Sequence, residues 1–283
     1  MLDEITVRKM PFEFPADIGA VFIDGDHKRS FDFIAGSLLL PHLEPYLNRS
    51  MKAAEKHVTD PVVAEGLDKF VRQEAQHYQM HKKFNETIRL AGFPKLEAFE
   101  KELSDDYHRF TNTKSLKFNL AYAEGFEALT MNVVKHLMEP NGFGDDLPPF
   151  MQMIEWHFVE ELEHRTIAFD VYDHVFGDYL YRLFVSIWAQ WHFTNWMRRV
   201  AAYMLKVRPQ KKRRKNEVIN RDDRLIDLSI QVNFYGRSAS VGSLLRAGLL
   251  RIYLPSYTPH SLEISPGIQK LADKYSKMAL ETS

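Results

Sequence analysis

Residues 157–164 read His157-Phe158-Val159-Glu160-Glu161-Leu162-Glu163-His164, and a second stretch upstream reads Glu74-Ala75-Gln76-His77. Both lie in long segments of helical character. On a helix, a spacing of three or four residues returns the side chain to the same face, about 40 to 60° away. Each Glu-x-x-His pair therefore directs a carboxylate and an imidazole toward one point, and His157 adds an imidazole one turn before Glu161. Together the two stretches predict a metal site.

A third carboxylate stands at a matching height. The first turn signal is Thr59-Asp60-Pro61, with Asp60 as a helix cap and Pro61 at the first helical position. Glu44 is 15 residues before Thr59, and Glu74 is 15 residues after it. In an antiparallel helical hairpin, residues equally far from the turn stand side by side. We therefore expect Glu44 to face Glu74.

A second hairpin repeats this arrangement. Its turn lies in residues 140–144, and Glu124 and Glu161 are 18 residues before and 19 residues after Gly142. Glu127, one turn from Glu124, is the alternative on the same helix. A four-helix bundle with one Glu on each of two helices, and Glu-x-x-His on each of the other two, is the di-iron or di-manganese carboxylate arrangement.

Helical patterns cover almost the whole chain and predict an all-α fold. The expected bundle helices span about residues 31–57, 61–90, 105–138 and 148–177, with a short helix over 95–104. Pro41 and Pro45 fall inside the first helix and should kink or interrupt it. Strand signals are few. We predict one domain over residues 1–283, with an irregular arm (1–28), a four-helix di-metal bundle (29–177) and a C-terminal helical extension (178–283).

The segment after Gly177 has a different character. Residues 179–207 are rich in large aromatic side chains, but polar residues such as Arg182 and Gln190 interrupt them within the roughly 20 apolar residues that a membrane span requires. We expect a helix packed across the bundle and no transmembrane span, with peripheral membrane contact left open. The basic run Lys211–Lys215 is interpreted as a solvated loop, and the stretch 225–256 as helical and then irregular.

Composition narrows the function. The chain has 283 residues and a formal net charge of -1, which permits a substantial core and gives no bulk attraction to nucleic acid. The absence of cysteine excludes disulfides, thiolate zinc sites and a cysteine nucleophile, and it suits a cytoplasmic protein. The N-terminus shows no signal-peptide pattern. No serine-hydrolase elbow, P-loop or dinucleotide fingerprint occurs in the sequence.

The motif residues also carry a family resemblance. Residues 72–77, followed by His81 and Asn85, and residues 156–164, leading to 168–172, resemble the bacterial family described as predicted metal-dependent hydrolases. The resemblance implies a ferritin-like helical bundle and covers about residues 31–172 best. The spacing of His157, Glu161 and His164 also resembles that of the p-aminobenzoate N-oxygenases, di-iron enzymes with an additional histidine ligand.

The resemblance implies a ligand set for two iron ions, with manganese or zinc as alternatives. One ion would be held by Glu44, Glu74 and His77. The other would be held by Glu124, Glu161 and His164, with His157 completing this second site. The chain departs from the family pattern at Gly125, which follows Glu124 where a histidine is frequent. The choice between Glu124 and Glu127 therefore stays open.

Three functional interpretations follow. The preferred one is a non-haem di-iron oxygenase or oxidase that activates dioxygen and oxidises a small organic amine or a lipid-like substrate. The alternative is a binuclear metal-dependent hydrolase. Iron storage is disfavoured, because about 110 residues follow the four-helix unit. The expected partners are a small-molecule substrate and dioxygen, a homodimer is left open, and no catalytic residue beyond the metal ligands is assigned.

Overall fold

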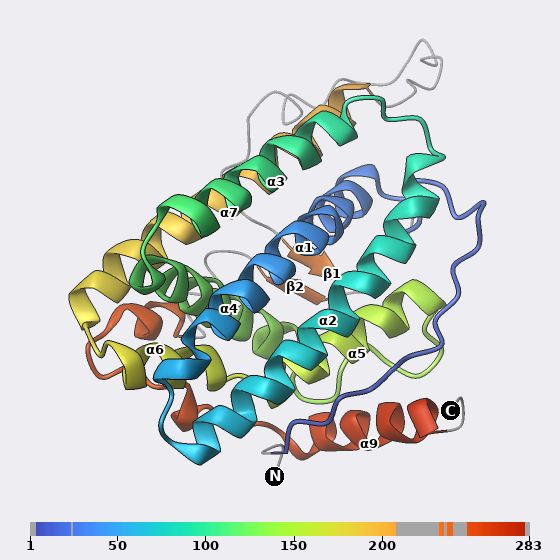
Figure 1. The fold of residues 1–283 in the computed structure, drawn as a ribbon. Helices are drawn as coiled ribbons and strands as arrows, with labels where there is room; N and C mark the ends of the chain where they lie inside the picture. The colour runs from blue at the N-terminus through green and yellow to red at the C-terminus, as the bar shows by residue number, and fades with distance from the viewer. Residues whose placement is uncertain (1–3, 24, 208–231, 235–236, 240–247, 281–283) are drawn as a thin grey trace.

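A computed structural model describes residues 4–23, 25–207, 232–234, 237–239 and 248–280 of the chain (Figure 1). The helices are α1 (His27–Ala54), α2 (Pro61–Arg89), α3 (Leu96–Thr113), α4 (Leu116–Met138), α5 (Pro149–Glu163), α6 (Ile167–Val175), α7 (Tyr179–Val207) and α9 (Pro266–Leu280), with short 3-10 helices η1 (Glu55–His57), η3 (Leu249–Tyr253) and η4 (Pro259–Ser261). One antiparallel hairpin joins β1 (Val232–Phe234) to β2 (Arg237–Ala239). The predicted all-α bundle is confirmed.

The first hairpin forms where the sequence places it. The Asp60 carboxylate accepts hydrogen bonds from the backbone N–H groups of Val62 and Val63, and Pro61 begins α2. A proline is favourable there because the first helical N–H has no partner within the helix. The helices α1 and α2 consequently run antiparallel and pack along their lengths (Figure 1).

The predicted interruption of the first helix is wrong, because α1 continues as one helix through Pro41 and Pro45. An interior proline costs about 3 kcal/mol in an isolated helix. In this fold α1 is surrounded by α2, α3, α4 and α7, and apolar residues such as Leu39, Leu43 and Leu47 are almost wholly buried. Burial of this kind stabilises the helix enough to offset the two prolines.

The third and fourth predicted helices are each divided. Ser115 accepts a hydrogen bond from the backbone N–H of Phe118 and begins α4, so residues 96–113 form the separate helix α3. The last predicted helix stops at Glu163 and restarts as α6 at Ile167. His164 occupies the break, with φ -94° and ψ 13°. The break places this histidine at the end of α5 rather than within a continuous helix.

The helix α7 packs across α1 and α4 (Figure 1). The closest approach is at Gly125 of α4, where an added Cβ would lie 2.5 Å from the Cα of Ser186. Glycine is therefore required there by the packing of two helix backbones, and a larger side chain would force them apart. No helix within the described ranges is long and apolar enough to cross a membrane.

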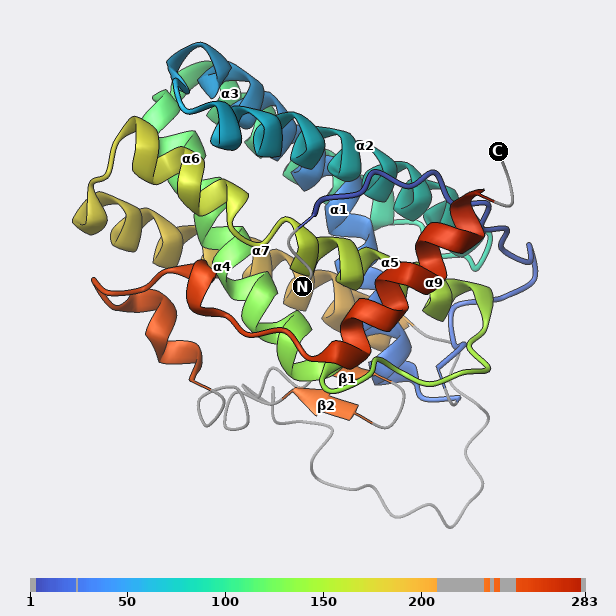
Figure 2. The same ribbon diagram turned by 90° about the horizontal axis from the view of Figure 1, so that it is seen from below.

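The two ends of the chain complete the core. The arm over residues 4–23 contains no helix, as predicted, and buries Met10 and Phe12 against the bundle. The helix α9 packs across α5, as Figure 2 shows, and buries Ile268 and Tyr275 in the same core. This shared core favours the single-domain organisation proposed above.

The C-terminal third differs in part from the prediction. Within the stretch 225–256, the described residues form β1, β2 and η3 and contain no α-helix, so the helix expected there is absent from them. The basic run Lys211–Lys215 lies outside the described residues.

Candidate metal centre

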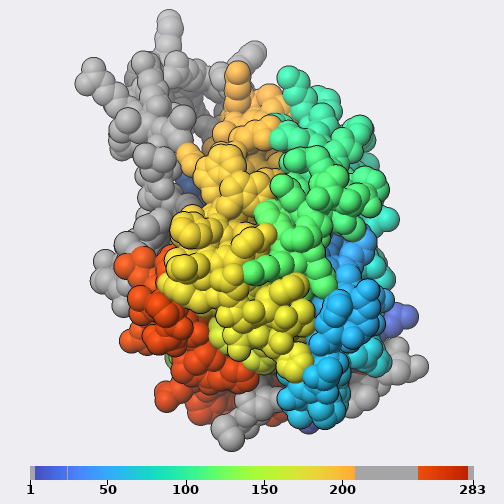
Figure 3. All heavy atoms as spheres, turned by 60° about the vertical axis from the view of Figure 1, so that its left-hand side comes forward, coloured from blue at the N-terminus to red at the C-terminus, as the bar shows by residue number. Residues whose placement is uncertain are grey.

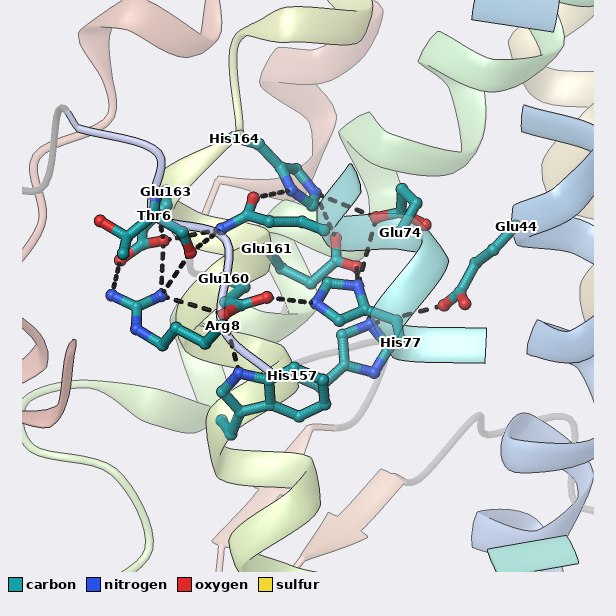
Figure 4. Close-up of polar contacts among 12 residues, drawn as sticks. Thr6, Arg8, Glu44, Glu74, His77, His157, Glu160, Glu161, Glu163 and His164 are labelled. Carbon is teal, nitrogen blue, oxygen red and sulfur yellow. Dashed lines mark hydrogen bonds and ion pairs between the residues drawn. The ribbon is translucent and has the colours of Figure 1, made fainter. Parts of the chain in front are cut away.

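Carboxylates and imidazoles converge in the space between α1, α2, α4 and α5. Two groups have ligand atoms that all lie within 4.8 Å of one another: Glu44, His77, His157 and Glu161 form the first, and Glu74, Glu161 and His164 form the second. Glu161 belongs to both. All of these side chains are almost wholly buried, and most of them are drawn in Figure 4.

In the first group, the Nε2 atom of His157 lies 2.8 Å from Oε1 of Glu161 and 3.6 Å from Oε1 of Glu44. The Nδ1 atom of His77 lies 3.9 Å from the same Glu161 oxygen. Three different helices thus supply this group: α1, α2 and α5. Their heights match because the hairpin turn at residues 58–60 is equally far from Glu44 and Glu74.

In the second group, the Nε2 atom of His164 lies 3.4 Å from Oε2 of Glu161 and 3.5 Å from Oε1 of Glu74. It also lies 3.8 Å from Oε2 of Glu127 on α4. Glu74 Oε1 is 3.3 Å from His77 Nδ1 as well. Glu161 and Glu74 therefore stand between the two groups, where bridging carboxylates would lie.

Many of these polar atoms have no hydrogen-bond partner among the described residues. They are both carboxylate oxygens of Glu44, Glu74 and Glu127, Oε2 of Glu161, Nδ1 of His77 and Nε2 of His164. Each buried polar group left unsatisfied costs about 1 to 3 kcal/mol, so native proteins contain few of them. Oxygen and nitrogen lone pairs that face one point satisfy each other poorly and suit cations well. The donor set therefore fits metal ions.

The charges of the cluster shift the ionisation of its members. Burial, together with the charge of Glu74, raises the pKa of Glu44 well above its usual range. Burial and the charge of Glu161 likewise raise the pKa of Glu127. Burial would also raise the pKa of Glu161, but the charge of His164 and a hydrogen bond from His157 lower it well below its usual range. Without cations the carboxylates therefore repel one another and tend to take up protons.

Each imidazole is oriented by a partner on its other nitrogen. The Nε2–H of His77 donates to Oε2 of Glu160 at 3.0 Å, which leaves Nδ1 facing the cluster. Oε1 of Glu160 accepts from the Trp156 indole at 2.7 Å and from Arg8 at 3.0 Å. Partners of this kind fix the tautomer and the ring plane of a metal-binding histidine.

His164 is held by a parallel chain of contacts. Its Nδ1–H donates to Oε1 of Gln73 at 2.9 Å, and the Gln73 amide donates to Glu163 at 2.8 Å. Glu163 also accepts from two nitrogens of Arg8, at 2.9 and 2.6 Å. One arginine of the N-terminal arm thus binds the carboxylates behind both His77 and His164 (Figure 4).

The tautomer of His157 follows from a third chain. The Ser37 hydroxyl donates to Oδ1 of Asn85 at 2.7 Å, so its oxygen accepts from Nδ1–H of His81 at 2.9 Å. The Nε2 atom of His81 is then an acceptor, and it lies 2.9 Å from Nδ1 of His157. His157 therefore carries its proton on Nδ1 and presents a free lone pair on Nε2 to Glu44 and Glu161.

The structure separates Glu124 from the other residues predicted to bind metal. Its carboxylate accepts from Arg182 at 2.8 Å and from Ser186 at 3.0 Å, both on α7. Glu127 is turned about 60° away on α4 and faces the cluster instead. The physical reason is the close contact of α7 with Gly125, which brings Arg182 and Ser186 beside Glu124. Glu127, the alternative on the same helix, is the residue that the fold brings to the other six.

The division of ligands also differs from the one that the resemblance implies. His157 lies with Glu44 and His77, and only the shared Glu161 connects it to the group of His164. Four residues behind the ligands were not predicted: Gln73, Glu160, Glu163 and Arg8. The first three lie within or beside the two quoted stretches, and their polarity on buried helices was a usable signal. Arg8 had none, because its segment shows no regular pattern.

Together the fold and the cluster define a class: an all-α bundle with a buried carboxylate and histidine centre of dinuclear type. The chain belongs to the family described as "Predicted metal-dependent hydrolase", whose family model matches residues 6–263. The match extends beyond residues 31–172 and includes the N-terminal arm and α7. Neither the curated proteins nor the solved structures give a match to this chain.

The family membership corrects the functional prediction. The preferred interpretation, a di-iron oxygenase or oxidase, is wrong, because the family is described by metal-dependent hydrolysis. The hydrolase alternative is the one that the family supports. Dependence on a metal agrees with the buried cluster, whereas iron, dioxygen as a partner and a homodimer receive no support. The ferritin-like comparison and the cytoplasmic location stay predictions.

Proposed function

We propose that this protein is a hydrolase whose active site holds two transition-metal ions. The supporting observation is the set of buried carboxylate oxygens and imidazole nitrogens that face one another without hydrogen-bond partners. The proposed ligands are Glu44, His77, His157 and Glu161 for one ion, and Glu74, Glu127, His164 and the shared Glu161 for the other.

The donor types favour manganese, iron or zinc. Three imidazoles disfavour magnesium and calcium, which prefer oxygen ligands, and the chain has no cysteine that could provide a thiolate. Four carboxylates carry four negative charges when they are ionised, so two divalent ions would balance them. This balance explains how so many acidic groups can share a buried space.

When bound, the ions supply Lewis acidity that polarises a carbonyl or phosphoryl oxygen of a small-molecule substrate and activates water. The protein's own part is to hold the donors in place. Glu160, Gln73 and His81 each fix the tautomer of one imidazole, so that a lone pair faces the ions. These contacts exist before any metal binds, and less rearrangement is needed on binding.

Aromatic rings limit the access of water to the cluster. The Trp156 ring lies 5.1 Å from the His77 ring, and the Phe70 ring lies 4.7 Å from the His164 ring. Both rings are fully buried. A dry environment strengthens the electrostatic attraction between ions and ligands, because the local dielectric constant is lower than that of water.

Metal analysis of the purified protein is the first test. We expect about two transition-metal ions per chain, as the two ligand groups imply. We also expect a lower melting temperature after chelation, since a ligand at 100 times its Kd stabilises by about 2.7 kcal/mol. Protein that binds no metal after supply of manganese, iron and zinc would reject the site.

Hydrolysis is tested separately. Metal-free protein should be inactive on a panel of esters, amides and phosphoesters, and redox-inert zinc should restore cleavage of one class. The Glu161→Gln variant is the matched negative control. Metal-loaded protein that cleaves none of these substrates would reject hydrolysis while leaving the metal site in place.

A further inference from the structure

The helix α7 carries a continuous stripe of exposed, large apolar side chains. Its members recur at spacings of three and four residues and so share one face: Leu180, Phe184, Ile187, Trp188 and Trp191. Phe184 is 69% exposed and Trp191 is 61% exposed. Figure 3 shows the first half of α7, in yellow, on the face turned toward the viewer.

The fold does not use this stripe. The opposite face of α7 already supplies buried residues to the core, among them Val185, Ala189, Phe193 and Trp196. Scattered exposed apolar residues are normal, but a contiguous stripe with two tryptophans is typical of a surface that binds a partner. Two further exposed leucines, Leu250 and Leu254, lie in or next to η3, whose Tyr253 carbonyl accepts a hydrogen bond from Tyr179 of α7.

The charge on this helix has one sign. Residues 179–207 contain no aspartate or glutamate, and the exposed face continues past the stripe to Arg198 and Lys206. Lys114, at the end of α3, lies 5.3 Å from the Phe118 ring, which in turn lies 5.6 Å from the Trp188 ring. The stripe is therefore bordered by cations, and α7 itself adds no acidic group to it.

We propose that this face of α7 binds the surface of an anionic lipid bilayer. The helix would lie in the plane of the interface, with Phe184, Trp188 and Trp191 among the headgroups and upper acyl chains and with Arg198 and Lys206 toward the phosphates. Tryptophan is enriched at this depth because its ring is amphipathic. Basic amphipathic helices bind such surfaces through buried apolar area and attraction to anionic lipids. This inference is independent of the proposed hydrolysis.

The test is sedimentation of the full-length, metal-loaded protein with vesicles. Vesicles of phosphatidylcholine mixed with phosphatidylglycerol should bind the protein, and vesicles of phosphatidylcholine alone should bind it about tenfold more weakly. Binding should shift the tryptophan emission to shorter wavelength, because Trp188 and Trp191 leave water. A wild-type protein that stays in the supernatant with both kinds of vesicle would overturn the proposal.

The variants locate the surface. Phe184→Glu combined with Ile187→Glu keeps both exposed tryptophans as reporters and should reduce binding by about tenfold or more. Leu90→Glu, at a residue that is 73% exposed at the end of α2, is the matched control and should bind like the wild type. Circular dichroism melting confirms that each variant is folded. Equal binding by the double variant and the control would assign the lipid contact elsewhere and reject α7.

A second copy of the chain is the competing occupant. Analytical ultracentrifugation without lipid distinguishes the two. A monomeric wild-type protein that binds anionic vesicles supports the membrane surface. A wild-type dimer that the double variant converts to a monomer, with no vesicle binding, would show that the stripe is a dimer interface instead.

Discussion

Two buried regions of this protein contain charged side chains, and they solve the problem of burial differently. Between α4 and α7, Arg182 neutralises Glu124, and the same carboxylate accepts a hydrogen bond from Ser186. Between α1, α2, α4 and α5, carboxylates and imidazoles face one another with atoms unsatisfied among the described residues. The first region is complete without a ligand, whereas the second lacks its cations.

The contrast is sharpest along one helix. Glu124 and Glu127 are three residues apart on α4, and both are almost wholly buried. Arg182 also lies 4.8 Å from the Phe169 ring, so the Glu124 pair is enclosed by partners. Neither Glu127 oxygen has a hydrogen-bond partner in the described part of the chain. Burial of an acidic residue therefore does not mark a site, and the lack of compensation does.

The largest expected effect follows from the carboxylate that both ligand groups share. Glu161→Gln removes a charged donor from each group. Loss of a residue behind a metal ligand typically weakens binding 10- to 100-fold, so loss of this shared ligand should weaken it by more than about 100-fold. Elemental analysis and metal titration should then show less than one ion per chain. Unchanged metal content would contradict the shared role of Glu161.

The second prediction uses the two carboxylates of α4 as a matched pair. Glu127→Gln should lower the metal content, since it removes a ligand. Glu124→Gln should keep the metal content but reduce the free energy of unfolding by about 3 kcal/mol, because Arg182 loses its buried counter-charge. Metal analysis and urea unfolding of both variants give the comparison. The opposite assignment of effects would return Glu124 to the ligand set.

The third prediction concerns Arg8, which lies behind both groups. Arg8→Ala leaves Glu160 and Glu163 without their cation, so His77 and Gln73 lose fixed partners. Metal affinity should fall by about tenfold. Lys83→Ala is the control, because Lys83 contacts Phe12 and Glu13 of the same arm and no residue of the cluster. Equal metal affinity in the two variants would limit Arg8 to holding the arm.

The smallest effect lies at a carboxylate that is compensated near the surface. Burial would raise the pKa of Glu100, but hydrogen bonds from His42 and Arg89 lower it below its usual value. Because the folded-state pKa is lowered, this pair stabilises the protein above the unfolded-state pKa, and the stabilisation is lost as pH falls through the folded-state value. We expect about 1 kcal/mol at pH 7.

The measurement for this last prediction is urea unfolding of the wild type and Glu100→Gln with chelator present, from pH 7 to acid. The difference between the two proteins should shrink as Glu100 becomes protonated. A difference that stays constant with pH would show that the charge of Glu100 contributes nothing.

Much of the candidate site could be predicted because helices impose a short period. Glu74 with His77, and Glu161 with His164, share a helix face whatever the rest of the fold does. The equal distances of Glu44 and Glu74 from the turn follow from hairpin geometry. The choice between Glu124 and Glu127 could not be made, since both are within one turn of the required height and only the partner helix distinguishes them.

The sequence by itself determined the helical class, the first hairpin turn and the residue types of the cluster, because caps, prolines and three-residue spacings act locally. Only the tertiary structure decided which carboxylate of α4 faces inward, where His164 leaves its helix, and which arm residue neutralises the charges behind the ligands. Those outcomes depend on contacts between segments far apart in the chain, such as Gly125 with Ser186 and Arg8 with Glu163. No local pattern encodes a contact of that kind, since its free energy depends on which groups are buried together.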